Sequence, residues 1–300
     1  MAAIEALGAA ESSRILDLLR ARVLATRRLA PFASGNAEVR ACLDELSPRV
    51  EKLRHMHAVL DANLERLDLI ARKAGIELFA GKGVGARDMY DDPSVRDFND
   101  IDIFVRSRAD ATQLSQALRN DHGYRYQHEE LPWFKLDPVD GLLYGQIALV
   151  APDEAPEYLN VDIHFGDYSV RHCSRLSITG TFPSEGPGLH RMAPEENLAC
   201  IVNNAAGDYL VTAKDTNDLL AAVGMPGFDV ARFAAQIRQA KLEPFLRSTT
   251  GTLHASSVPT AEEERALDAL PGARAWEPAP KPDGSDWRRR CVGTTLHRAA

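Results

Sequence analysis

One stretch limits the possible fold more than any other. Residues 79–105 read FAGKGVGARDMYDDPSVRDFNDIDIFV, an apolar segment, a glycine-rich turn and a second segment that opens with two alternating aspartates. Because strand side chains alternate between faces, Asp100 and Asp102 point to one face of a strand. Ile101 and Ile103 point to the other face. The stretch therefore predicts a sheet with an apolar, covered face and a face that presents converging carboxylates.

These carboxylates have a third candidate partner. In LNVDIH, residues 159–164, Asp162 shares a strand face with His164. Like charges held close together cost free energy unless a cation neutralises them, and Mg²⁺ binds through carboxylate oxygens. We therefore expect a Mg²⁺ or Mn²⁺ site at Asp100, Asp102 and Asp162. The alternative is that the acids form the solvated face of an edge strand.

The glycine turn allows a second interpretation. Residues 81–86, GKGVGA, satisfy the relaxed dinucleotide-binding pattern, which would make the chain an NAD(P)-binding oxidoreductase. In that class the ribose-binding acid lies at the end of the second strand. Here the acids precede the apolar run, and residues 105–107 (Val-Arg-Ser) offer no acid. The order of residues favours a metal site over a dinucleotide site.

Composition limits the class of protein and of partner. The chain has 300 residues, 45% of them hydrophobic, which is enough for one large domain or two smaller ones. A net charge of −8 makes nucleic acid an unlikely partner. No basic segment precedes an apolar run and no membrane-spanning run is visible, so we expect a cytoplasmic protein. The cysteines fit no zinc or disulfide spacing: Cys42, Cys173, Cys200 and Cys291.

Periodicity and turn signals predict an α+β fold with a mixed sheet. Residues 1–74 form N-terminal helices (11–30 and 47–74), residues 75–190 the core, residues 191–270 a helical region, and residues 271–300 a disordered tail. The expected core strands cover 76–80, 100–105, 133–136, 142–150 and 158–165, with a helix at 110–120. The expected C-terminal helices cover 194–206, 209–223 and 230–240.

The motifs in this order resemble a known family. The strand, Gly-Lys-Gly, a helix, Met-Tyr-Asp-Asp-Pro at 89–93, Arg96 and Asp-Ile-Asp at 100–102 are similar to the uncharacterised nucleotidyltransferase family of the polymerase-β-like superfamily. Val-Asp-Ile-His at 161–164 and the helix containing Lys-Asp-Thr-Asn-Asp-Leu at 214–219 also match. The resemblance covers residues 76–223. In the broad superfamily the turn is Gly-Ser or Gly-Gly, whereas here Lys82 follows Gly81.

The resemblance implies a polymerase-β-like core and an activity. Such enzymes transfer a nucleoside monophosphate from a nucleoside triphosphate, here to a small-molecule or protein acceptor, and release pyrophosphate. The implied metal ligands and catalytic residues are Asp100, Asp102 and Asp162. The implied nucleotide-binding residues are Gly81, Lys82, Gly83, Arg96 and Lys214, with His164 and Asp218 in supporting positions. An inactive interaction module with the same fold is the other alternative.

Overall fold

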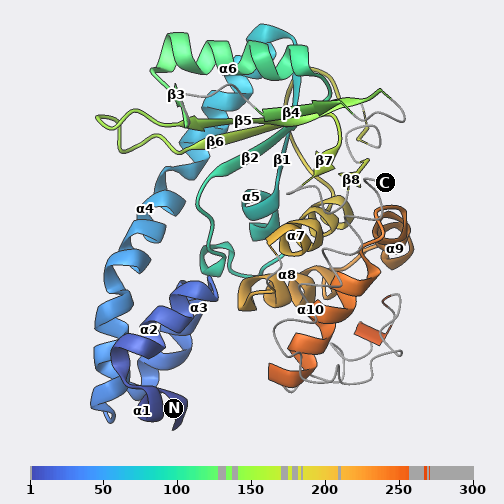
Figure 1. Cartoon of the computed structure of the whole chain (residues 1–300). Coiled ribbons are helices and arrows are strands. Elements are labelled where there is room, and N and C mark those ends of the chain that lie inside the picture. The colour runs from blue at the N-terminus through green and yellow to red at the C-terminus, as the bar shows by residue number, and fades with distance from the viewer. Residues whose placement is uncertain are drawn as a thin grey trace.

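The computed structural model describes residues 2–127, 133–136, 141–169, 175–177, 182–183, 185–208, 211–256, 267–268 and 270. Within them a mixed sheet is flanked by helices on both faces (Figure 1). The predicted α+β class and mixed sheet are confirmed. None of the helices in this part of the chain is long and apolar enough to cross a membrane. The predicted tail, 271–300, lies outside the described residues.

The main sheet has the strand order β3-β5-β6-β2-β1-β9, and β4 also pairs with β5. Its strands are β1 (Glu77–Gly81), β2 (Ile101–Val105), β3 (Arg125–Tyr126), β4 (Trp133–Leu136), β5 (Leu143–Val150), β6 (Val161–Phe165) and β9 (Gly188–Arg191). Strands β2 and β6 are parallel, whereas β1 and β2 are antiparallel. A separate ribbon pairs β7 (Tyr168–Ser169) with β8 (Arg175–Leu176).

Helices surround this sheet. They are α1 (Ala2–Leu7), α2 (Ala9–Leu18), α3 (Arg22–Leu29), α4 (Ala37–Ala74), α5 (Lys82–Arg87), α6 (Arg108–His122), α7 (Pro194–Asp208), α8 (Ala213–Val223), α9 (Val230–Gln239) and α10 (Glu243–Ser256). Two 3₁₀ turns complete this set: η1 (Ala30–Phe32) lies between α3 and α4, and η2 (Pro93–Val95) lies between α5 and β2. In Figure 1 the long α4 runs from the sheet to the N-terminal helices, and α7 and α8 lie on the other side of the molecule.

The two sheet faces bury different cores. Ile101, Ile103 and Ile163 join the core formed with α4 and α6. Phe79 and Phe104 point to the opposite face and join the core formed with α7. The predicted alternation of β2 side chains is therefore confirmed, and the carboxylates lie on the α7 side.

Helix α4 is longer than the sequence predicts. It begins at Ala37 rather than near residue 47 and contains Pro48. The side chain of Asn36 accepts a hydrogen bond from the Val39 N–H and so caps the helix. Proline removes one helical hydrogen bond, but the buried stripe continues on both sides of it, at Val39, Cys42, Leu46, Val50 and Leu53. Packing of this stripe on the N-terminal helices outweighs the cost of the proline.

The expected single helix over 11–30 is two helices. Helix α2 ends at Leu18, Arg20 adopts a left-handed backbone conformation with φ 53°, and α3 begins at Arg22. The Arg22 N–H donates to the buried Asp97 carboxylate at 3.0 Å. A tertiary contact thus supplies an acceptor for a free N–H in the first turn of α3. The helix is interrupted at Arg20 so that Arg22 can make this contact with Asp97.

Candidate functional site

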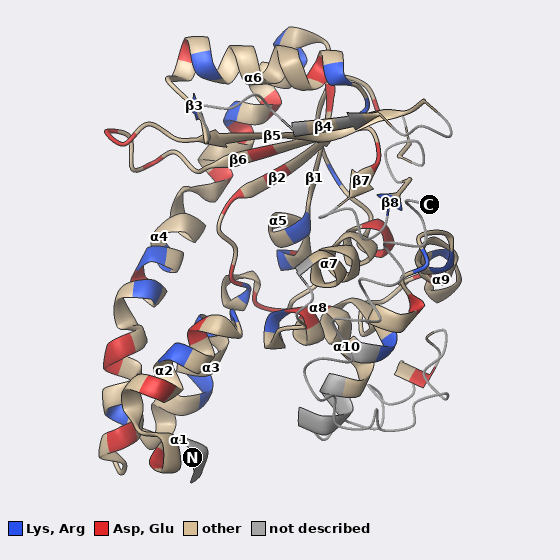
Figure 2. Cartoon of the chain, viewed as in Figure 1, with Lys and Arg blue, Asp and Glu red and all other residues tan. Residues whose placement is uncertain are grey.

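Strand register brings two of the predicted metal ligands together. Strands β2 and β6 are parallel with Asp102 opposite Asp162 and Phe104 opposite His164. Side chains opposite each other on adjacent strands share a face. Single ligand atoms of Asp102, Asp162 and His164 all lie within 4.8 Å of one another. Figure 2 shows acidic residues on β2, on β6 and on the loop that leads into β2.

The third predicted ligand, Asp100, is not part of this group of three, although its charge interacts with those of Asp102 and Asp162. Asp100 lies one residue before β2 and is partly buried. Burial, and then the charge of Asp102, raise the pKa of Asp100 to about 6. Burial, and then the charges of Asp102 and Asp100, raise the pKa of Asp162 to about 7. The three carboxylates therefore repel one another in a site with little solvent.

Two side chains share one oxygen of Asp102. Lys82 Nζ lies 2.6 Å, and His164 Nε2 3.0 Å, from Asp102 Oδ1. Burial favours the neutral acid, but Lys82 and His164 keep the pKa of Asp102 below its ordinary value. Burial also lowers the pKa of His164. Gln146 Nε2 donates to Asp162 Oδ2 at 2.7 Å and fixes the second carboxylate.

The glycine segment predicts a turn over residues 81–85 that opens a helix toward Tyr90, and most of this turn is itself helical in the structure. Strand β1 ends at Gly81 and α5 begins at once with Lys82, which has a left-handed φ of 47°. Gly83 and Gly85 lie inside α5, where tight packing leaves no room for a side chain. A Cβ atom on Gly83 would stand 2.8 Å from Phe98 Cβ, and a Cβ atom on Gly85 would stand 3.0 Å from Asn197 Oδ1. These glycines allow close packing around the site.

The pairing of β1 with β2 bears on the dinucleotide alternative. Nicotinamide-binding folds place the glycine turn between parallel strands joined by a crossover helix. Here β1 and β2 are antiparallel, with Gly81 opposite Asp102, and the helix between them spans Lys82–Arg87 only. The glycine segment is therefore not part of a parallel strand-helix-strand unit.

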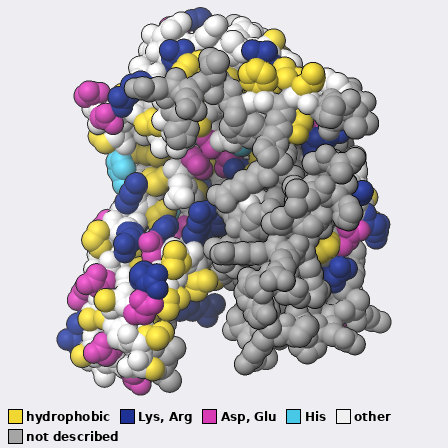
Figure 3. Space-filling view, in the orientation of Figure 1, with side chains coloured by type: hydrophobic (Ala, Val, Ile, Leu, Met, Phe, Trp, Pro, Cys, Tyr) yellow, Lys and Arg dark blue, Asp and Glu magenta, His cyan; other side chains and the backbone are white. Residues whose placement is uncertain are grey.

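A polar cleft opens beside the carboxylates. Its volume is about 230 Å³, and Lys82, Gly83, Asp100 and Asp102 contribute to its wall. A second cavity of about 250 Å³ adjoins it and does not include these four residues. The two cavities share five lining residues, which come from the N-terminal region, α7 and α8: Arg20, Arg22, Asn204, Lys214 and Asp215. Figure 3 shows Lys and Arg side chains gathered beside the hollow below the sheet.

Lys214 enters the cleft from the first turn of α8. The Thr212 side chain accepts from the Asp215 N–H, and the Asp215 side chain accepts from the Thr212 N–H, so a capping box fixes the start of the helix. Lys214 Nζ lies 3.8 Å from Asp215 Oδ1. Burial, followed by repulsion from Arg96, lowers the pKa of Lys214. Because the ion pair with Asp215 is long, the Lys214 ammonium group is suited to bind an anionic ligand.

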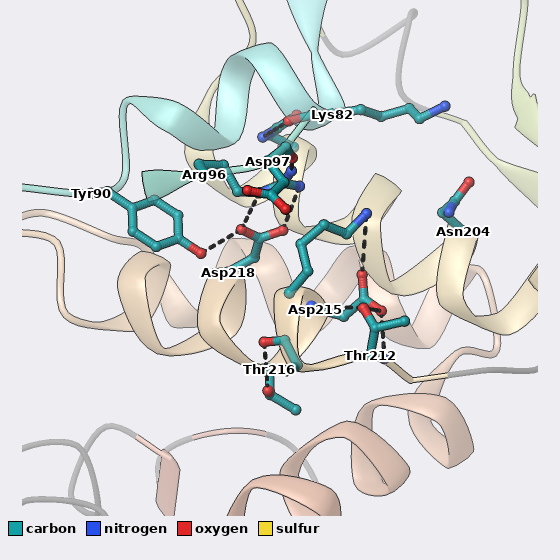
Figure 4. Close-up of polar contacts among 12 residues, drawn as sticks. Lys82, Tyr90, Arg96, Asp97, Asn204, Thr212, Asp215, Thr216 and Asp218 are labelled. Atoms are coloured by element: carbon teal, nitrogen blue, oxygen red, sulfur yellow. Dashed lines mark hydrogen bonds and ion pairs between the residues drawn. The ribbon is translucent and has the colours of Figure 1, made fainter. Parts of the chain in front are cut away.

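Arg96 has a different environment from the one expected of a phosphate ligand. It is 3% exposed, and its Nε and Nη2 donate to the two oxygens of Asp218 at 2.6 and 2.7 Å. The Tyr90 hydroxyl also donates to Asp218, at 2.7 Å. Figure 4 shows Tyr90, Arg96 and Asp218 pointing toward one another, with Asp97 beside them. The pair ties α8 to the segment that leads into Asp100.

Other contributors to the site were not predicted from the sequence. Gln146 gives no sequence signal beyond its polar side chain. Tyr90 belongs to the Met-Tyr-Asp-Asp-Pro motif at 89–93, but the motif alone did not predict its bond to Asp218. Arg20 and Asp97 depend on the packing of the N-terminal helices against the segment before β2. Of the four cysteines, which fit no zinc spacing, Cys173 and Cys291 lie outside the described residues.

Comparison with known proteins gives one match. No curated protein and no solved structure matches the chain significantly. A family model described as "Uncharacterised nucleotidyltransferase" matches residues 5–257, which include the N-terminal helices, the sheet and α7 to α10. The chain thus belongs to the uncharacterised nucleotidyltransferase family.

Proposed function

We propose that this protein is a metal-dependent nucleotidyltransferase that transfers a nucleoside monophosphate from a nucleoside triphosphate to a small-molecule or protein acceptor and releases pyrophosphate. The observation that carries the proposal is the register of β2 and β6, which places Asp162 beside Asp102, a residue that lines a cleft containing both cations and carboxylates. Family membership supports the reaction class.

The residues present fit a divalent metal ion. Carboxylate oxygens are the preferred ligands of Mg²⁺ and suit Mn²⁺. Asp102 and Asp162 lie together in the structure, and Asp100, whose charge interacts with both, is the proposed third ligand. A bound ion would neutralise these charges and polarise a phosphoryl oxygen. His164 holds one oxygen of Asp102 through Nε2, so we assign it the role of orienting that carboxylate.

Two lysines are the proposed phosphate ligands. Lys82 and Lys214 line the same cleft, from α5 and α8. Lys82 Nζ bonds Asp102 in this structure, and binding of a triphosphate would exchange this carboxylate for phosphate oxygens. Gly83 also lines the cleft and presents its backbone there, while Gly81 lies opposite Asp102 on the neighbouring strand. Arg96 and Asp218 act by positioning the segment that carries Asp100.

Asp162 is the proposed proton acceptor for the incoming nucleophile. It lies beside Asp102 on the neighbouring strand, and Gln146 restrains one of its oxygens. An inactive module would be expected to lack part of this set, whereas all three carboxylates are present. The net charge of −8 makes a small molecule or protein a better acceptor than a long nucleic acid.

Isotope position tests the reaction class. The protein is incubated with Mg²⁺, fractionated cell extract as a source of acceptor, and each nucleoside triphosphate labelled at either the α- or the γ-phosphorus. Nucleotidyl transfer puts the α-label on the acceptor and the γ-label in pyrophosphate, and Asp102→Asn abolishes both. Transfer of the γ-label to the acceptor would identify a kinase and refute the proposal.

A further inference from the structure

Arg20 is a cation that the N-terminal helices contribute to the cleft. It lies in the turn between α2 and α3 and lines both cavities. The other cations of the cleft have carboxylate partners: Arg22 pairs with Asp97, Lys82 with Asp102, Arg96 with Asp218 and Lys214 with Asp215. Arg20 forms no ion pair with any residue in the described part of the chain. A partly buried guanidinium without a carboxylate partner is suited to bind an anionic ligand.

Two anchors hold Arg20 in place. On one side, the Lys214 N–H donates to the Leu19 carbonyl at 3.3 Å and joins the turn to α8. On the other side, the Arg22 N–H donates to Asp97 Oδ2 at 3.0 Å and joins the turn to the segment before β2. Between these anchors Arg20 adopts φ 53°, a left-handed conformation that is strained for a residue other than glycine.

The local charge is consistent with this placement. Burial is the largest cause of the lowered pKa of Lys214, and the charges of Arg96 and Arg20 lower it further. Arg20 and Lys214, which both line the two cavities, therefore repel each other. An anion with more than one negative charge would relieve this repulsion, and a guanidinium can bind two phosphate oxygens at once.

We propose that Arg20 and Lys214 together bind the terminal phosphates of the donor nucleotide, so that the N-terminal helices form part of the nucleotide site. The proposal rests on the nucleotidyltransferase function above and specifies which part of the donor is recognised. Arg20 and Lys214 line both the cleft that contains Asp100 and Asp102 and the second cavity, which does not include these carboxylates. They contact the phosphates beyond the one that is transferred, and so favour a triphosphate over a monophosphate.

The test compares binding by variants that keep the fold. Arg20→Gly removes the side chain, and glycine adopts the left-handed conformation without strain. Arg20→Lys keeps the charge but loses the planar fork. Arg14→Ala is the control, because Arg14 lies on α2 with a side chain 63% exposed and pairs with Glu11 on the surface. Calorimetry measures binding of inorganic tripolyphosphate and of each nucleoside tri- and monophosphate with Mg²⁺, and thermal unfolding checks the fold of each variant.

Arg20→Gly should weaken binding of triphosphates and of tripolyphosphate about 10- to 100-fold, as expected for loss of a charge-assisted hydrogen bond, and leave monophosphate binding unchanged. Arg20→Lys should fall between it and wild type. Equal affinities of Arg20→Gly and Arg14→Ala for triphosphates would refute the proposal and leave the nucleotidyltransferase function standing. If wild type bound tripolyphosphate through Arg20 but bound no nucleotide, the anion site would stand and the proposed function would fail.

Discussion

The buried pair of Arg96 and Asp218 gives the sharpest stability prediction. Asp218 is fully buried and Arg96 is 3% exposed, and three hydrogen bonds of 2.6 to 2.7 Å end on the carboxylate of Asp218. In Asp218→Asn the new amide group directs N–H groups at donors of Arg96 or Tyr90. The variant therefore leaves a buried guanidinium without its counter-charge and with a donor facing a donor.

The expected cost is large. Breaking a buried ion pair by removing one partner costs about 3–5 kcal/mol, which for a chain of this size lowers the melting temperature by roughly 6–20 °C. Tyr90→Phe removes one hydrogen bond to the carboxylate and keeps the ion pair, so it should cost less, about 1.5–3 kcal/mol. The matched control is Asp153→Asn, because Asp153 pairs with Arg125 at 2.8 Å with both side chains more than half exposed. That change should cost about 1 kcal/mol or less.

Guanidinium chloride unfolding, followed by circular dichroism, measures these differences. Arg96→Met combined with Asp218→Leu should recover part of the loss, because no buried charge then remains unpaired. If Asp218→Asn cost no more than Asp153→Asn, the pair would not hold α8 against the segment before β2, and the reasoning would be refuted.

Two further predictions concern the surroundings of the cleft. The contribution of His57 to stability should fall as the pH is lowered from 7 to 5, because burial lowers the pKa of His57 to about 4, whereas the unfolded chain takes up this proton near pH 6.5. The raised pKa values of Asp100 and Asp162 act in the opposite direction, so the effect is read from the difference between wild type and His57→Phe, in which the new ring replaces the imidazole that packs against Phe98. Over this range the free energy of unfolding of wild type should fall relative to that of His57→Phe, and parallel profiles would contradict the prediction. Gly83→Ala should cost about 1–3 kcal/mol because the new Cβ would stand 2.8 Å from Phe98 Cβ. Gly35→Ala, which meets nothing within 4 Å, is the control, and equal denaturation midpoints would show that Gly83 is not constrained by packing.

The sequence could predict which side chains share a face. The alternation of Asp102 with Ile101 and Ile103 depends only on strand geometry, and the core packing of the isoleucines confirms it. Asp100, expected in the same strand, lies one residue before β2. The same logic places Asp162 with His164. The sequence could not predict that β2 and β6 pair in the register that puts Asp102 opposite Asp162, because no local pattern specifies which strands become neighbours.

Tertiary contacts decided the features that the sequence did not predict. Strand β9 is short and contains His190 and Arg191, so its pairing with β1 leaves no apolar signal. Helix α4 continues through Pro48 because packing outweighs the lost hydrogen bond. The break at Arg20 follows from the contact of Arg22 with Asp97. The division of the chain into N-terminal helices, core and C-terminal region stays a prediction.

The central claim is that the carboxylates of β2 and β6 form a metal-dependent nucleotide site. The most direct measurement is calorimetric binding of the four ribonucleoside triphosphates and of NAD, with and without Mg²⁺, to wild type and to the double variant Asp100→Ala/Asp102→Ala. We predict that wild type binds at least one triphosphate only when Mg²⁺ is present, and that the double variant does not bind it. Tight NAD binding that is indifferent to Mg²⁺ and to both aspartates would contradict the claim.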